Sequence, residues 1–320
     1  MKSDEAVDVA KGAYSSYGYS YVLEHIYFPD RVREMNKQDE LISYVCVTTD
    51  GEVIAHCALE MEEADPKIPQ LGVAFTKPKY RGQGCLNRMA ACCMDDAENR
   101  GLYGVYARGV TTHPYSQKSL LNFDLLDCAI YISSGAIREY KGIEGTKQRE
   151  SVMIHFKCLN PNSGLSVYPP IHHKEIIDEI YNNIKLKPQF KTFDEKLDLP
   201  ECKSVIDIQT DQLNMVGKIR IKEYGIDILS EIQKNLKALC MDRMDTIYLY
   251  LNLSDPFTAK YTEEFEKSGF FFGGVIPGSD NGDMLMLQYL NNYKIDYDKI
   301  KVASDSGNKL LEYIKRRDVG

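Results

Sequence analysis

The sequence predicts an α/β protein built from two successive units. Its length of 320 residues corresponds to about two domains. Segments with the pattern of β-strands alternate with segments of helical periodicity in both halves of the chain. Between the halves, the stretch 161–170 contains Gly and several Pro residues, which is typical of a linker. We therefore expect one unit over 1–160 and a second over 171–320.

Composition and charge narrow the classes of function. Apolar residues make up 43% of the chain and charged residues 27%, so each half can bury a core of its own. A net charge of −8 argues against nucleic acid and anionic membranes as partners. The nine cysteines include no CxxC pair, which indicates reduced thiols, no disulfide framework and no metal site. Residues 1–30 show no signal-peptide core, so we expect a cytoplasmic protein.

The elements of the first half follow from periodicity and turn signals. The triplet Thr49-Asp50-Gly51 separates two β-rich runs and predicts a hairpin. Gly101 follows the last periodic residue of a helix and predicts its end. The expected order is a helix at 4–13, an aromatic-rich segment at 14–28, strands at 41–48, 52–60 and 70–76, a helix at 86–99, a strand at 103–110, a helix at 115–126, and strands at 128–133 and 150–159.

The second half repeats this order. Pro114 and Pro256 lie 142 residues apart, while the turn residues Thr49 and Thr210 lie 161 apart. The difference of 19 residues predicts a deletion in the second copy, at the short strand and the loop that follows it. The expected elements are a helix at 172–186, a hairpin at 204–224, a helix at 227–241, a strand at 246–253, a helix at 258–268, strands at 270–276 and 283–290, and a terminal helix at 309–317.

The loop Tyr80-Arg81-Gly82-Gln83-Gly84-Cys85-Leu86 lies between a short strand and a helix. The first turn of a helix leaves several N–H groups without partners and carries partial positive charge. The two glycines let the main chain approach a bulky phosphate, and Arg81 adds a fixed positive charge. The loop therefore predicts a pyrophosphate site.

The segment 72–84 resembles the fourth strand and pyrophosphate loop of the GNAT acetyltransferase superfamily, and the resemblance extends over about 4–159. It implies a mixed, mostly antiparallel central sheet flanked by helices, with acetyl-CoA as co-substrate. Together with the repeated order of elements, it implies that the second half is a degenerate domain of the same type without the pyrophosphate loop. The cofactor residues that it implies are Ala74, Phe75 and Thr76 for the pantetheine, Arg81, Gly82, Gln83, Gly84, Cys85 and Leu86 for the pyrophosphate, and Ser116 and Ser119 for the pantetheine arm.

The catalytic groups follow less directly from the pattern. Glu60 ends the hairpin strand beside the cofactor strand and is a candidate general base. His113, at the entrance of the later helix, is a second candidate base. The family often has a tyrosine acid in that helix, but Phe123 occupies the position here. Tyr115 is therefore the candidate acid, with Tyr131 as a further substitute.

We expect an N-acetyltransferase that acts on a primary amine, with the second unit forming one wall of the acceptor cleft. The acceptor stays open between a small-molecule amine and a protein amine, and so does the oligomeric state. Phe123 supports an alternative, a non-catalytic acyl-CoA-binding regulatory or sensor module. A third hypothesis makes the second unit a surface that binds a protein whose lysine is acetylated.

Overall fold

The computed structural model describes residues 1–18, 21, 23–62, 65–137, 147–161, 164–280 and 282–318. In this part of the chain, eleven strands form one continuous sheet, and two short strands form another. The strands are β1 (Leu41–Val47), β2 (Val53–Glu62), β3 (Asp65–Thr76), β4 (Gly104–Val110), β5 (Leu126–Gly135), β6 (Glu150–Cys158), β7 (Ser166–Val167), β8 (Gln189–Phe190), β9 (Val205–Asp211), β10 (Val216–Glu223), β11 (Thr246–Asn252), β12 (Phe271–Ile276) and β13 (Met284–Leu290). The α-helices are α1 (Ala6–Tyr17), α2 (Pro29–Lys37), α3 (Cys85–Asn99), α4 (Tyr115–Leu121), α5 (Lys174–Asn183), α6 (Ile228–Met241), α7 (Pro256–Lys267) and α8 (Asp305–Arg317).

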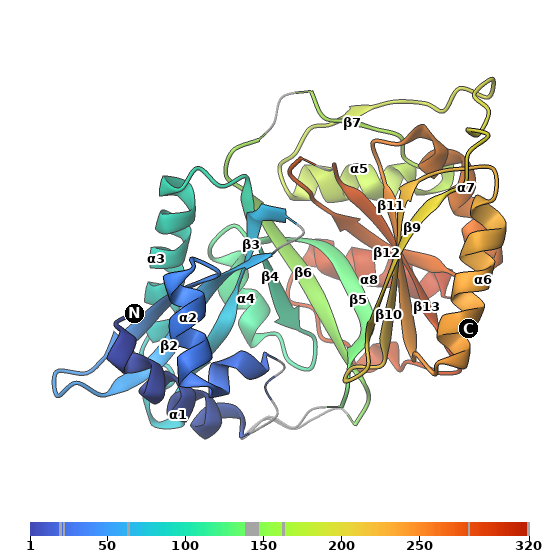
Figure 1. The fold of residues 1–320 in the computed structure, drawn as a ribbon. Helices are drawn as coiled ribbons and strands as arrows, with labels where there is room; N and C mark the ends of the chain where they lie inside the picture. Colours follow the sequence, from blue (N-terminus) through green and yellow to red (C-terminus); the bar gives the residue numbers. More distant parts are fainter. Residues whose placement is uncertain are drawn as a thin grey trace.

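The large sheet has the strand order β1-β2-β3-β4-β6-β5-β12-β13-β11-β10-β9. Its neighbouring strands run antiparallel, except that β3 is parallel to β4 and β10 is parallel to β11. Figure 1 shows the N-terminal half on one side of the molecule and the C-terminal half on the other, with β5 and β12 between them. The predicted class, a mixed and mostly antiparallel sheet flanked by helices, is confirmed.

Helices cover both faces of the N-terminal half of the sheet. Met89, Cys93 and Ala97 recur every fourth residue along α3 and pack on one face. The helices α1 and α2 pack on the other face, against Phe75 among others. Gly12 lets α1 approach closely, because a Cβ there would lie 2.4 Å from the Phe75 ring.

The seam between the halves is the contact of β5 with β12. Ala129 and Gly274 are register partners across it. A Cβ on Gly274 would lie 2.4 Å from the Cα of Ala129, and φ is +135° there, so the close approach requires glycine. The helices α5 and α8 pack on this seam, and one hydrophobic core continues through it.

The order of elements in the C-terminal half corrects the position of the expected deletion. The series β9-β10-α6-β11-α7-β12-β13 repeats β2-β3-α3-β4-α4-β5-β6, with a parallel strand pair around each first helix. The strand β10 thus occupies the place of β3, so the short strand is kept. What differs is the connection to the helix, which shortens from residues 77–84 to 224–227. Matching the turn residues Thr49 and Thr210 aligned the hairpin β9-β10 with β1-β2, whereas it corresponds to β2-β3. The sequence could not prevent this error, because an alternating pattern does not reveal the direction of a strand.

Several boundaries also differ from expectation. The helix α2 was not predicted, although Pro29 at its first turn is a typical start signal. The strand β3 begins at Asp65 and not at residue 70 as expected. Its first part was not predicted because Pro66 and Pro69 are untypical of a strand. The helix expected over 115–126 ends at Leu121, and β5 starts five residues later. No helix among the described residues has the length and apolar character needed to span a membrane.

Candidate active site

The sheet opens between the parallel strands β3 and β4. Their register pair is Gln70 with Tyr106, after which β3 continues beside β2 and β4 beside β6. A bulge in β3 accompanies the opening, and Val73 adopts a φ of +49° there. The Nδ1 atom of the buried His56 lies 2.6 Å from the Val73 carbonyl oxygen. Burial lowers the pKa of His56 to about 4, so the neutral ring donates this hydrogen bond and holds the bulge.

Backbone groups of the bulged strand face the opening. Lys77 bonds to Ile54 of β2, so by the alternation along a strand Ala74 and Thr76 direct their polar groups away from β2. The Tyr17 hydroxyl donates to the Ala74 carbonyl at 2.7 Å, and Arg81 Nε donates to the Thr76 carbonyl at 3.4 Å. Phe75 instead buries its ring under α1. Of the three predicted cofactor residues on this strand, Ala74 and Thr76 therefore present backbone groups to the opening, whereas Phe75 does not.

The glycine loop leads from this strand into α3 and is exposed from Arg81 to Gly84. Gly82 and Gly84 have φ values of +79° and +73°, which residues with a Cβ adopt at a cost. Gly84 is the N-cap of α3 and supplies no side-chain cap, so the first N–H groups of the helix keep their capacity to bind an anion. A Cβ at either glycine would meet open space. The loop is thus shaped by backbone conformation and left uncovered.

The loop is anchored at both ends. Before it, Glu52 accepts hydrogen bonds from Tyr80 at 2.6 Å and from Lys77 at 3.0 Å, and these bonds lower the pKa of Glu52 to about 2. After it, the Cys85 side chain is buried in the core under α3, while Leu86 is only partly buried. Gln83 is exposed and directs its carbonyl to Arg88, which donates from Nη2 at 2.9 Å.

Glu60 lies in a row of side chains that crosses three strands. It is the register partner of Gln70 on β3, which in turn is the partner of Tyr106 on β4. The Glu60 side chain is 17% exposed, and burial raises its pKa to about 7, with a further contribution from Glu62. His25 Nε2 lies 3.8 Å from the Glu60 carboxylate. A carboxyl group that exchanges its proton near neutral pH is suited to act as a general base.

The remaining predicted residues lie at or beside α4. Ser119 Oγ donates to Asn87 Oδ1 at 2.7 Å, which ties α4 to the first turn of α3. Ser116 Oγ is buried and has no hydrogen-bond partner among the described residues. Tyr115 is 69% exposed, and its ring centroid lies 5.2 Å from that of His113. Burial lowers the pKa of His113, so its ring is neutral at pH 7. Among the described residues, no hydrogen bond or ion pair was found that joins Glu60 to any of these four residues, Tyr115, His113, Ser116 and Ser119.

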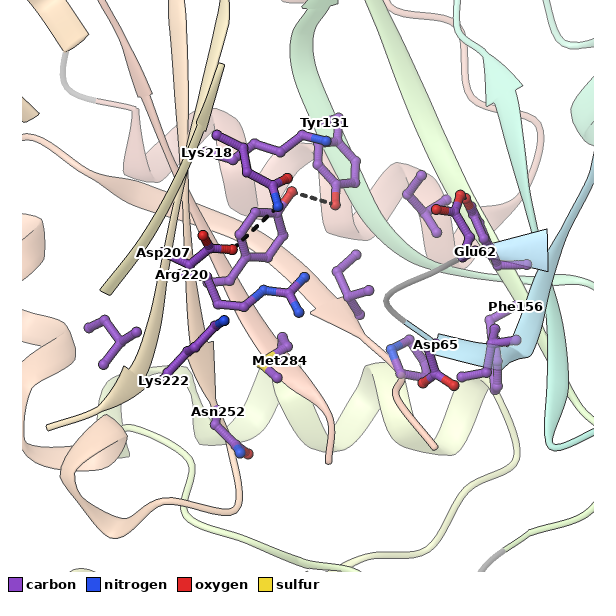
Figure 2. Close-up of a pocket in the computed structure, with 18 of the residues that line it drawn as sticks. Glu62, Asp65, Tyr131, Phe156, Asp207, Lys218, Arg220, Lys222, Asn252 and Met284 are labelled. Carbon is purple, nitrogen blue, oxygen red and sulfur yellow. Dashed lines mark hydrogen bonds between the residues drawn. The ribbon is translucent and has the colours of Figure 1, made fainter. Parts of the chain in front are cut away.

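A cavity of about 700 Å³ lies between the two halves of the chain. Figure 2 shows Lys218, Arg220 and Lys222 of β10 on one side of it and Glu62 and Asp65 on the opposite side. These residues were missed at the level of sequence. One signal was present, because cationic side chains alternate with isoleucines over residues 218–222, so that three charges share one face of a strand.

Tyr106 and Arg108 of β4 also line the cavity and were missed as well. The Tyr106 hydroxyl donates to Glu62, and its oxygen lies 3.0 Å from Gln70 Oε1. The cavity therefore reaches the row that contains Glu60 and the place where β3 and β4 separate.

The fold and the loop define an α/β protein with an exposed glycine loop, suited to bind an anion, at the opening of its sheet. Residues 11–120 match the model of the acetyltransferase (GNAT) family, and this part of the chain is a GNAT acetyltransferase domain. The family resemblance of the sequence is thus confirmed over residues 11–120. A comparison with curated proteins gives no match.

Solved structures similar to the chain include three N-acetyltransferases. The ribosomal-protein-S18-alanine N-acetyltransferase of Escherichia coli is 11% identical over 51% of this chain and 93% of its own, with a TM-score of 0.40. An N-acetyltransferase of Staphylococcus aureus Mu50 is 12% identical over 50% and 96%, with a TM-score of 0.39. A chimeric spermidine N-acetyltransferase from Vibrio cholerae and hSSAT is 11% identical over 50% and 94%, with a TM-score of 0.40.

Proposed function

We propose that this protein transfers an acetyl group from acetyl-CoA to a primary amine, and that the loop 81–86 holds the pyrophosphate of the cofactor. The observation that carries the proposal is the left-handed conformation of Gly82 and Gly84 directly before α3, at the point where the sheet opens. Uncapped helix N–H groups and an exposed Arg81 suit two adjacent phosphates.

The pantetheine arm then extends from the loop along β3. Ala74 and Thr76 carry backbone groups on the side that faces the opening, so the amides of the arm can pair with them as an added strand does. Tyr17 and Arg81 would give up their present bonds to these two carbonyls. Ser116 supports the same path, because its buried hydroxyl lacks a partner among the described residues and Ser119 lies one turn further along α4.

Glu60 takes a proton from the ammonium group of the acceptor in this mechanism. The free amine nitrogen attacks the thioester carbonyl carbon, and backbone N–H groups near the bulge at Val73 stabilise the oxyanion. The C–S bond then breaks, the nitrogen loses its second proton, and the CoA thiolate takes up a proton. Tyr115 is the proposed acid at this last step, and His113 is the second candidate base.

The C-terminal residues 171–320 are proposed as a degenerate second domain of the same type, following a first domain over 1–160. The repeated order of elements supports this proposal, and the short 224–227 connection supports cofactor binding by the first domain alone. The second domain then contributes a wall of the acceptor cleft.

Thiol release tests the proposal. The purified protein is incubated with acetyl-CoA and a panel of primary amines, and free CoA is measured. We expect amine-dependent release together with formation of the acetylated amine. Phe123, in place of a tyrosine acid, favours a second candidate, a CoA-binding sensor without turnover. Saturable CoA binding with no release on any amine would support that sensor and contradict the enzyme.

A further inference from the structure

The cavity between the halves has a wall of cationic side chains that faces acidic side chains on the opposite side. The cationic wall is the face of β10 that carries Lys218, Arg220 and Lys222. These three side chains share a face because they alternate along the strand. The opposite face of β10 packs under α6, where a Cβ on Gly217 would lie 2.9 Å from Leu239. The cations therefore point toward the N-terminal half.

The cations of the cavity lack hydrogen-bond and ion-pair partners among the described residues, whereas its acids accept hydrogen bonds. Among the described residues, no side-chain hydrogen bond or ion pair involves Arg108, Lys218, Arg220 or Lys222. By contrast, Glu62 accepts from Tyr106, Asp65 accepts from the Ser279 hydroxyl at 2.5 Å and from its N–H at 2.8 Å, and Asp207 accepts from Gln209 at 3.3 Å. The unsatisfied hydrogen-bonding capacity of this cavity is thus cationic.

Two of these cations are held in position by tyrosine rings. The Arg220 guanidinium carbon lies 5.6 Å from the Tyr250 ring centroid, and that of Arg108 lies 5.9 Å from the Tyr106 ring centroid. The Tyr250 hydroxyl lies 2.9 Å from that of Tyr131, which fixes the first ring against β5. Planar guanidinium groups fixed in this way suit carboxylate or phosphate oxygens.

The burial of Lys218 also favours binding of an anion in the cavity. It lowers the pKa of Lys218, and the nearby Arg108 and Arg220 lower it further, while Glu62 and Asp211 offset only part of this shift. The charges of Lys218 and Arg108 come from different halves of the chain and repel each other across the cavity. A bound anion would relieve this repulsion.

One row of register partners links the candidate base to the cavity. Glu60, Gln70 and Tyr106 occupy three adjacent strands, and Tyr106 lines the cavity. Strands in a sheet are spaced by about 4.8 Å, so the row from Glu60 to Tyr106 spans roughly 10 Å. A cavity of about 700 Å³ is within the range of small-molecule sites.

We propose that this cavity is the acceptor site and that the acceptor is a small amine with a carboxylate or phosphate at its other end. Arg108, Lys218, Arg220 and Lys222 hold the anionic group, and the amine lies toward Glu60. This inference rests on the proposed acetyl transfer. It selects against polyamines, because a second ammonium group would face four cations.

The test compares three kinds of amine as acceptors. L-glutamate represents amino carboxylates, O-phosphoethanolamine represents amino phosphates, and putrescine represents amines without an anion. The variant is the double change Arg220→Gln and Lys222→Gln, and the matched control is Lys237→Gln on the exposed side of α6. We expect the double variant to raise the KM of the preferred anionic amine about 10- to 100-fold, with kcat and the Kd for CoA little changed. We expect the control to behave as the unmodified protein.

Comparing L-glutamate with O-phosphoethanolamine identifies whether the cavity holds a carboxylate or a phosphate. Equal or better use of putrescine, or an unchanged KM in the double variant, would overturn the proposal. If no amine is acetylated, the same amines are titrated calorimetrically. Binding of an anionic amine that the double variant loses would then support the site while contradicting the enzyme. Absence of any such binding would overturn the site.

Discussion

Glu60 shows how burial, with a smaller contribution from a neighbouring acid, can raise the pKa of one side chain. The carboxyl group is mostly enclosed, its neighbour Glu62 is also acidic, and burial lowers the pKa of the adjacent His25, which keeps that ring neutral. Nothing close by stabilises the charged form strongly. The result is a carboxyl group whose pKa of about 7 suits proton exchange with an amine.

The variant Glu60→Gln tests this role. In the unmodified protein, kcat/KM should rise with pH through about 7 as Glu60 loses its proton, and then level off. Glu60→Gln should lower kcat about 100- to 10,000-fold at pH 8 and abolish that inflection. Rates measured from pH 5.5 to 9 check both effects. A variant that keeps the inflection would rule Glu60 out as the base.

Stability gives an independent measurement on the same residue. A pKa raised in the folded state means that folding favours the protonated form, so stability falls as pH rises from about 4.5 to about 7. Glu60→Gln should therefore be more stable than the unmodified protein at pH 8, by up to about 3 kcal/mol, and similar to it at pH 4. Urea unfolding at the two pH values measures the difference. Equal effects at both would contradict the shifted pKa.

Single residues were predictable where chemistry is local. The glycine loop and Glu60 could be found because a turn and a strand end can be recognised in the sequence. Tyr106 and Arg108 could not, because their importance depends on which strands meet across the opening. The cations at 218–222 had a visible alternation, but only the tertiary structure brings them to the same cavity as β4.

At the scale of elements, Gly12 of α1 determines how closely this helix approaches β3. Gly12 makes this contact, and Tyr17 at the end of the same helix bonds to Ala74. The sequence predicted the helix but gave no sign of the approach, which depends on the bulge in β3.

Gly12→Ala should destabilise the protein by about 1–3 kcal/mol, because the new Cβ overlaps the buried Phe75 ring. Urea unfolding measures the loss. The rescue is Phe75→Leu in the same chain, since a smaller side chain leaves room for the Cβ. If the double variant loses as much stability as the two single losses added together, the Cβ and the Phe75 ring do not clash.

At the scale of the whole molecule, the C-terminal helix ties the halves together. Asp127 of β5 lies 2.8 Å from His155 of β6, and both side chains are buried. The same carboxylate accepts a hydrogen bond from Ser304, the N-cap of α8. A second tie is Arg149, which reaches Asp245 at 2.9 Å and the Asn214 carbonyl at 2.5 Å. Such contacts between distant segments could not be read from the sequence.

Asp127→Ala should cost about 3–5 kcal/mol, because it leaves His155 buried without its partner and removes the acceptor for Ser304. The control is Asp298→Ala, whose side chain is 89% exposed and lies 3.4 Å from Lys315, and which should cost less than about 1 kcal/mol. Thermal and urea unfolding measure both variants. Similar small losses would show that Asp127 does not hold α8 against the N-terminal half.

The central claim, that the loop 81–86 binds the pyrophosphate of CoA, is tested most directly by calorimetric titration of CoA into two variants. Gly84→Glu and Gly101→Glu introduce the same side chain at glycines with φ near +70° and open surroundings, at opposite ends of α3. They therefore match in backbone strain and charge. We expect Gly84→Glu to weaken CoA binding at least 100-fold, because a carboxylate would stand where the phosphates bind, and Gly101→Glu to retain it. Normal CoA binding by Gly84→Glu, or no CoA binding by the unmodified protein, would contradict the claim.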